Sequence, residues 1–192
     1  MSEGSFGYEN LIAVTDRRMC GEEFEKQVRR VAACRPAGLI LREKDLADAE
    51  YIILAGRIRK ICEAESVPLF VHGRLAAARA VGCRNLHLPL PVLRAVGGKP
   101  QGIDMMSVSC HSREDVESAE ALGADRILLG TIFPTGSKPG LPGKGISFVR
   151  EICAGTSLPV FAIGGITMSN LAEVMAAGAA GGCMMSGFMK LR

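Results

Sequence analysis

The sequence lacks the features that would assign it to several large classes of protein. No apolar run approaches the roughly 20 residues that a membrane-spanning helix needs, and the start of the chain, Met1–Gly7, lacks the charged and apolar regions of a signal peptide. The net charge of +3 is small and scattered, which argues against nucleic acid or a membrane surface as a partner. We therefore expect a cytoplasmic protein that binds neither.

The seven cysteines form neither a disulfide framework nor a metal site. They are odd in number and spread out, with no C-x-x-C pair. Cys34, Cys62 and Cys153 fall in helical stretches, and Cys110 and Cys183 fall in apolar strands. This pattern indicates reduced thiols that pack as small hydrophobic groups. None of the three histidines stands at metal-ligand spacing from Cys, Asp or Glu, so no zinc site is expected.

Short apolar runs alternate along the chain with longer amphipathic stretches. The short runs are apolar at nearly every position, as expected for a parallel sheet covered on its outer face. The expected strands are Leu11–Val14, Gly38–Leu41, Leu69–Val71, Asn85–Leu88, Met105–Ser109, Arg126–Leu129, Val160–Ile163 and Gly182–Met185. The clearest helical patterns are Glu22–Ala33, Asp48–Glu65, Arg74–Val81, Arg113–Leu122, Ile146–Ala154 and Met168–Ala177.

Eight strands with about seven intervening helices predict a (β/α)8 TIM barrel. A doubly wound open sheet would also alternate strands and helices, so the count of strands decides between the two folds. The chain shows no linker, low-complexity tract or second domain. A length of 192 residues favours a single domain, so residues 1–192 are expected to form one barrel.

Local signals mark several helix ends. Gly82, Gly123 and Gly178 occupy equivalent places in a weak internal repeat, where each is expected to end a helix in the left-handed conformation. Ser112 begins a stretch that resembles a capping box, and Thr167 is expected to cap a helix that starts at Met168.

The chain ends soon after the last expected strand. Only Ser186–Arg192 follows Met185, which is too short for a full eighth helix. A truncated or missing eighth helix would leave the outer face of the first and last strands partly bare. We expect either the N-terminal segment Met1–Asn10 or a partner subunit in a homodimer to cover this face.

The stretch Ile127–Pro142 joins a buried strand to a loop rich in glycine and proline. The loop carries the hydroxyl groups of Thr131, Thr135 and Ser137 and the cation of Lys138. Such a loop suits an anionic ligand at the end of a strand, and a rigid surface turn explains it equally well when it is considered alone.

Two later loops favour phosphate binding. In a (β/α)8 barrel, phosphate groups often bind the loops after the seventh and eighth strands, which here are Ile163–Ile166 and Met185–Gly187. Glycine in these loops lets backbone N–H groups approach an anion, and a helix that starts after Thr167 would add its positive end. A tight turn is the alternative for each loop.

The loops after the second and third strands add positive charge. Arg42 and Lys44 alternate with Glu43, so an extended chain would direct both cations toward the mouth of the barrel. Together with Lys138 and the His72–Arg74 loop, they would form a positively charged pocket at the mouth of the barrel. A solvated cluster of charges is the alternative for each loop singly.

The three histidines differ in their positions. His87 lies inside the fourth strand and is expected to be a hydrogen-bonded wall residue. His111 follows the fifth strand and is expected to order its loop. His72 stands where the third strand ends, which makes it the best-placed candidate for an acid or base near neutral pH.

Taken in order, the loop motifs resemble those of the thiamine phosphate synthase and thiazole tautomerase (TenI) family. The motifs are V-T-D-R, L-R-E-K-D, H-G-R, H-L-P, S-V-S-C-H-S, G-T-I-F-P-T-G-S-K, A-I-G-G-I-T and M-S-G. They cover almost the whole chain and stop where the eighth helix should be. The resemblance implies a (β/α)8 barrel that acts on a phosphorylated thiazole in thiamine biosynthesis.

The resemblance also implies roles for particular residues. The residues implied to hold the thiazole phosphate are Gly164, Gly165, Ser186 and Gly187, with Thr131 and Thr135 nearby. The residues implied to hold a pyrophosphate in the synthase branch are Arg42, Lys44, Ser109 and Lys138. That branch joins a hydroxymethylpyrimidine diphosphate to the thiazole phosphate, and a magnesium ion neutralises the departing pyrophosphate.

The chain departs from both branches of the family. His72-Gly73 replaces the Asn-Asp of the synthases and Pro89–Val92 replaces their Gly-Gln-Glu-Asp, so both magnesium carboxylates are missing. A glutamine expected before Arg-Glu-Lys is Ile40. The tautomerases move a proton without a metal, but their histidine after the sixth strand is Thr131 here. We therefore take His72 as the expected acid or base, with Thr131 and Lys138 as further catalytic candidates.

These observations predict one of three functions. The first is a TenI-like thiazole tautomerase that uses no metal or other cofactor. The second is a divergent thiamine phosphate synthase, which would need magnesium. The third is a catalytically inactive barrel that binds a thiazole phosphate or thiamine phosphate as a regulator.

Overall fold

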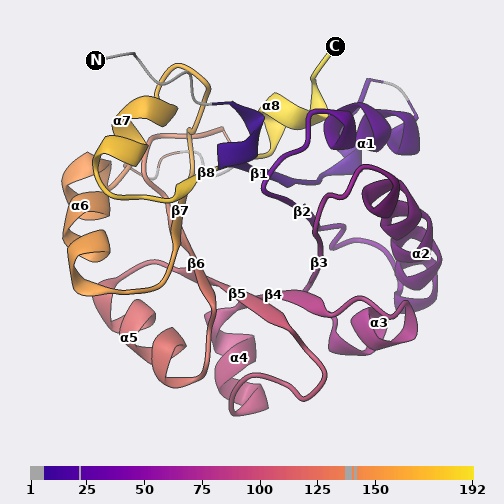
Figure 1. The fold of residues 1–192 in the computed structure, drawn as a ribbon, viewed down its shortest axis with the longest axis horizontal. Coiled ribbons are helices and arrows are strands. Elements are labelled where there is room, and N and C mark those ends of the chain that lie inside the picture. The colour runs from indigo at the N-terminus through magenta and orange to yellow at the C-terminus, as the bar shows by residue number, and fades with distance from the viewer. Residues whose placement is uncertain (1–6, 22, 137–139, 141) are drawn as a thin grey trace.

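The computed structural model describes residues 7–21, 23–136, 140 and 142–192. In this part of the chain, eight parallel strands close into a barrel in the order β1 to β8 (Figure 1). The strands are β1 (Leu11–Val14), β2 (Gly38–Leu41), β3 (Leu69–His72), β4 (Asn85–Pro89), β5 (Met105–Cys110), β6 (Arg126–Gly130), β7 (Val160–Ile163) and β8 (Gly181–Met184).

Closure of the sheet confirms the predicted (β/α)8 barrel. Strand β1 pairs with β2 on one side and with β8 on the other, where Leu11 lies opposite Gly182 and Ala13 lies opposite Met184. A doubly wound open sheet would leave two edge strands, each paired on one side only. That alternative is therefore wrong.

Helices surround the barrel and cover the outer face of its strands (Figure 1). The α-helices are α1 (Phe24–Ala33), α2 (Asp48–Ala64), α3 (Leu75–Ala80), α4 (Leu90–Val96), α5 (Arg113–Ala121), α6 (Gly145–Gly155), α7 (Leu171–Ala176) and α8 (Ser186–Met189). Two short 3-10 helices, η1 (Tyr8–Asn10) and η2 (Arg17–Met19), flank β1. None of the helices in the described part of the chain has the length and apolar character that a membrane crossing requires.

The strands are apolar throughout because both of their faces are buried. Outward-facing side chains pack beneath the helices, and inward-facing side chains form a second, smaller core inside the barrel. The buried members of the inner core are Ile12, Val14, Ile40, Phe70, Leu128, Phe161 and Cys183. All seven cysteines are free thiols, as expected from their spacing.

An arginine lies at the amino-terminal end of the inner core. Arg126, the first residue of β6, places its guanidinium carbon 5.3 Å from the ring centre of Phe70 and 4.7 Å from that of Phe161. Its Nη1 is buried and has no hydrogen-bond partner among the described residues. The attraction of a cation for two aromatic faces stabilises the side chain there, so the base of the barrel carries a positive charge.

The eighth helix is truncated, as predicted. Helix α8 has a single turn, and its Phe188 and Met189 are almost completely buried. The side chain of Gln27, on α1, donates hydrogen bonds from Nε2 to the carbonyl oxygens of Phe188 (2.6 Å) and Leu191 (3.0 Å). The ring centre of Tyr8 lies 5.7 Å from that of Phe188. The N-terminal side of the chain and α1 therefore cover this face in part.

Most of the predicted helix ends are confirmed, and one is wrong. The Ser112 side chain caps α5 by accepting a hydrogen bond from the backbone N–H of Asp115 at 3.1 Å. Helix α7 begins at Leu171 instead of Met168, so Thr167 is not its cap. Residues 168–170 form a turn in which Asn170 Oδ1 accepts from the N–H of Thr167 at 2.9 Å. The expected glycines at positions 82, 123 and 178 have positive φ angles of 65°, 82° and 103°.

Candidate functional site

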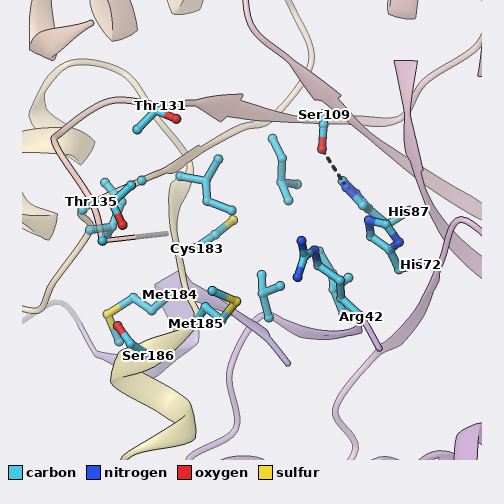
Figure 2. A pocket seen from close by; sticks show the side chains of 18 of the residues that line it. Arg42, His72, His87, Ser109, Thr131, Thr135, Cys183, Met184, Met185 and Ser186 are labelled. Atoms are coloured by element: carbon cyan, nitrogen blue, oxygen red, sulfur yellow. Dashed lines mark hydrogen bonds between the residues drawn. The ribbon is translucent and has the colours of Figure 1, made fainter. Parts of the chain in front are cut away.

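A cavity of about 620 Å³ opens at the carboxyl ends of the strands, where ligands bind in this fold (Figure 2). Side chains from all eight strands or from the loops that follow them reach its walls. The lining includes these residues that were predicted from the sequence: Arg42, Lys44, His72, Ser109, Thr131, Thr135, Gly164, Gly165 and Ser186. The loops singled out by their composition therefore do converge on one place.

One of the predicted site residues does not line this cavity, and another lies outside the described residues. Gly187 lies in the first turn of α8, where an added Cβ would come 3.1 Å from the Cε of Met184. Glycine at that position makes room for the methionine side chain, which does line the cavity. Lys138 and Ser137 lie outside the described residues, so the role predicted for Lys138 stays a prediction.

The loop after β2 sends alternate side chains in opposite directions, as its sequence predicts. Arg42 and Lys44 face the cavity, while the Glu43 side chain is almost completely buried behind them. Glu43 accepts hydrogen bonds from Thr15 Oγ1 at 2.6 Å and from Arg17, through its N–H and its Nη1, both at 3.1 Å. Thr15 Oγ1 accepts in turn from the N–H of Arg42 at 2.9 Å. The ends of β1 and β2 thus hold Arg42 in its direction.

Among the described residues, the charged side chains that line the cavity are positive. Arg42 and Lys44 are its cations, and no Asp or Glu lines it in the part of the chain that the structure describes. The Arg42 guanidinium has no hydrogen bond or ion pair with any described residue. Because opposite charge attracts most strongly where few counter-charges lie nearby, this cavity favours anionic ligands.

Two histidine rings lie side by side between the ends of β3 and β4 (Figure 2). The ring centres of His72 and His87 are 5.3 Å apart, and the planes are tilted by 35°. Burial, followed by the charges of Arg42 and Lys44, lowers the pKa of His72 to about 4. Burial, followed by the charges of His72 and Arg42, lowers the pKa of His87 well below its ordinary value. Both rings are therefore neutral at pH 7.

The lowered pKa of His72 predicts a pH dependence of stability. The unfolded chain, with a histidine pKa near 6.5, binds more protons than the folded chain between that pH and about 4. The free energy of unfolding should therefore be highest above pH 6.5 and fall as the pH falls, with about 2 kcal/mol lost through His72 by pH 5. Urea unfolding at pH 7 and pH 5 should show a smaller loss for His72→Asn than for the wild type. An equal loss in both proteins would contradict the prediction.

The third histidine orders a loop, as expected from its position. His111 Nδ1 donates to the carbonyl oxygen of Gly130 at 2.7 Å, which links the ends of β5 and β6. The Lys144 ammonium group donates to the carbonyl oxygen of His111, which ties the start of α6 to the same loop. Cys110, the neighbour of His111, is buried beneath the helices and does not form a dyad with it.

The glycines after β7 have a packing role that the sequence did not reveal. A Cβ on Gly164 would come 2.4 Å from Cγ2 of Thr131, and a Cβ on Gly165 would come 2.7 Å from Cβ of Phe133. Both glycines also have positive φ angles, 100° and 65°. Close approach of the β6 and β7 loops therefore requires glycine here, whether or not a phosphate binds.

Sequence reasoning missed the apolar part of the cavity. Its walls include Ile40, Leu128, Ile163, Cys183 and Met185, which continue the inner core upward to the mouth. The signal was present in the period of two along each strand, because alternate residues face the barrel axis. The cavity thus combines an apolar floor with polar groups at its rim, as pockets for small ligands usually do.

Several known proteins that are similar to this chain are named thiamine-phosphate synthase. A family model described as thiamine monophosphate synthase matches residues 11–188. Thiamine-phosphate synthase 2 from Streptococcus pneumoniae is 37% identical over 165 residues, which is 82% of this chain and 77% of that protein. Thiamine-phosphate synthase from Methanoculleus marisnigri is 38% identical over 185 residues, 94% of this chain and 87% of that protein.

A solved structure agrees with these relatives. Thiamine phosphate pyrophosphorylase from Pyrococcus furiosus matches this fold with a TM-score of 0.81 and 26% identity, and the match covers 95% of this chain and 88% of that one. The names support the synthase alternative more than the tautomerase that the sequence placed first. The match over nearly the whole barrel confirms the resemblance seen in the loop motifs: the chain belongs to the thiamine monophosphate synthase family.

Proposed function

We propose that the protein joins a hydroxymethylpyrimidine diphosphate to a thiazole phosphate and releases pyrophosphate. In this reaction, the thiazole nitrogen forms a bond to the methylene carbon of the pyrimidine, and the bond from that carbon to the diphosphate oxygen breaks. The proposal depends on one observation above all. Groups suited to anions lie on two sides of one cavity, with an apolar floor between them (Figure 2).

One side suits the diphosphate. Arg42 and Ser109 lie together near the two histidines, and Lys44 follows Arg42 on the same loop. An arginine can bind two phosphate oxygens at once, and the positive charges would stabilise the pyrophosphate as it leaves. Lys138, which lies outside the described residues, is the further cation proposed for this side.

The other side suits a monophosphate. Thr131, Thr135 and Ser186 bring small polar side chains to the cavity beside the glycine loop after β7 (Figure 2). Between the two sides, Ile40, Leu128 and Met185 offer an apolar surface for the two heterocyclic rings. The names of the relatives, thiamine-phosphate synthase and thiamine phosphate pyrophosphorylase, support the same reaction.

Magnesium does not fit the side chains that line this cavity. The ion prefers carboxylate and other oxygen ligands in an octahedral arrangement, and no carboxylate lines the cavity in the described part of the chain. Among the same residues, no group of three or more His, Cys, Asp or Glu side chains gathers to hold a metal. In our proposal, Arg42 and Lys44 therefore carry the neutralisation of the departing pyrophosphate.

The absence of carboxylates among the described residues of the cavity favours a second candidate, a metal-independent thiazole tautomerase. Such an enzyme moves one proton, for which it needs a base in its neutral form. His72 faces the cavity, and its ring is neutral at pH 7. It is the base that this second reaction would use.

One set of assays separates the candidates. With the pyrimidine diphosphate and thiazole phosphate as substrates, a synthase releases pyrophosphate, and we expect release with or without added magnesium. With the thiazole carboxylate phosphate tautomer, only a tautomerase gives a changed proton NMR spectrum, and that activity should be lost in His72→Asn. Binding of thiazole phosphate without either turnover would overturn both proposals and leave an inactive binder.

A further inference from the structure

A buried hydrogen-bond chain connects the inner wall of the barrel to the cavity. Strands β4 and β5 pair so that His87 lies opposite Ser107 and Pro89 lies opposite Ser109. Because side chains alternate along a strand, Ser107 and Ser109 both point inward, and the His87 ring reaches both. Its Nδ1 bonds to Ser107 Oγ, and its Nε2 lies 2.9 Å from Ser109 Oγ (Figure 2).

We infer that His87 is a positioning residue that keeps the hydroxyl group of Ser109 available as a hydrogen-bond donor to an anionic ligand in the cavity. The identity of that ligand as a diphosphate depends on the proposed function. The orientation of the hydroxyl group does not, since it follows from the contacts of the protein alone.

Ser107, at the buried end of this hydrogen-bond chain, fixes the tautomer of His87. Ser107 is 1% exposed, and His87 is the partner of its hydroxyl group among the described residues. A buried hydroxyl proton needs an acceptor, because leaving it unpaired costs free energy. Nδ1 of His87 is that acceptor, so it carries no proton.

The proton of the neutral ring must then lie on the other nitrogen. A neutral imidazole has one N–H donor and one acceptor, so Nε2 carries the proton and donates it to Ser109 Oγ. The ring stays neutral because its burial opposes protonation, as does the positive charge of Arg42. A second proton on Nδ1 would also leave the Ser107 hydroxyl without its acceptor.

This arrangement decides what Ser109 offers to a ligand. Its oxygen already accepts from Nε2, so its own O–H is not used by the histidine and points away from it. Ser109 lines the cavity on the side of Arg42, where a phosphate oxygen would accept the bond. With the opposite tautomer, Ser109 would donate to His87 and present only lone pairs, which an anion repels.

The tautomer can be read directly in the wild-type protein. The nitrogen NMR shifts of histidine separate a protonated ring nitrogen from an unprotonated one, and the chain has only three histidines to assign. The signals that vanish in His87→Gln belong to His87. We expect a protonated Nε2 and an unprotonated Nδ1 at pH 7. A protonated Nδ1 would overturn the inference without affecting the proposed reaction.

Binding of inorganic pyrophosphate, measured by calorimetry, tests the consequence. Loss of a hydrogen bond to an anion costs roughly tenfold in affinity, so Ser109→Ala should bind about 10-fold more weakly. His87→Leu should bind nearly as weakly, although Ser109 is intact. His87→Gln should recover part of the loss, because an amide can accept from Ser107 and donate to Ser109.

Two further variants complete the test. Ser107→Ala removes the group that selects the tautomer, so it should also weaken pyrophosphate binding and produce a mixture of His87 tautomers. Ser118→Ala, on helix α5 outside the barrel, controls for the loss of a serine hydroxyl and should bind like the wild type. Unchanged binding in a folded His87→Leu protein would overturn the inference. If the variants change pyrophosphate binding as expected but the wild type shows no turnover, the proposed function is rejected and the inference about His87 stands.

Discussion

Replacing Arg42 with methionine is expected to weaken pyrophosphate binding by about 100-fold or more. The guanidinium faces the cavity, has no partner among the described residues, and would form charge-assisted bonds to two phosphate oxygens. Each such bond contributes roughly 1.5–3 kcal/mol, and methionine keeps much of the side-chain length without the charge. Calorimetry with inorganic pyrophosphate measures the affinity, and pyrophosphate release measures the accompanying loss of turnover.

Two other variants make this result specific. Arg42→Lys keeps the charge but not the planar pair of donors. Its affinity for pyrophosphate should therefore lie between those of Arg42→Met and the wild type. Arg57→Met removes an arginine from the outer surface of α2, where it pairs with Glu25, and should bind pyrophosphate normally. If Arg42→Met bound pyrophosphate as tightly as Arg57→Met, Arg42 would not be part of the anion site.

Replacing Glu43 with alanine is expected to cause the largest loss of stability. The residue is 2% exposed and accepts from Thr15 and Arg17 at the junction of β1 and β2. Removing one partner of a buried ion pair costs about 3–5 kcal/mol, and the lower end applies because Arg17 is 30% exposed and also pairs with Asp45. A loss of about 3 kcal/mol corresponds to a Tm lower by about 10 °C.

Asp45→Ala is the matched control for this variant. Asp45 binds the same arginine with two contacts of 2.7 Å, but its side chain is 44% exposed. Water can replace its contacts, so thermal unfolding should show a much smaller change. Equal losses of Tm in Glu43→Ala and Asp45→Ala would show that burial of Glu43 does not matter. The Glu43 variant should also bind pyrophosphate more weakly, because Thr15 helps to hold Arg42.

The barrel was predictable because its strands leave an unusually clear trace in the sequence. Parallel strands buried on both faces appear as short, continuous apolar runs, and three of the eight were predicted to the residue: β1, β2 and β7. Helix α4 was not among the clearest patterns, since Pro89-Leu90-Pro91 suggests a loop. Pro91 is tolerated because it lies in the first turn, where its missing N–H would have had no partner within the helix.

Only those parts of the site that lie at strand ends could be predicted from the sequence. The loops at Arg42, Ser109, Gly164 and Ser186 could be brought together from the fold alone, because every strand ends at the same rim. The contact between His87 and Ser109 could not be predicted in this way. It depends on the register of β4 against β5, which a single sequence does not encode in any local pattern.

Arg126, at the base of the barrel, affects the rate at which an anionic ligand would bind. Arg126 places a positive charge at the amino-terminal end of the axis, and Arg42 and Lys44 place two more at the open end. An anion that approaches from solvent is therefore attracted toward the open end of the barrel before it touches any binding group. Such long-range steering quickens capture at low ionic strength and fades as added salt shortens the Debye length.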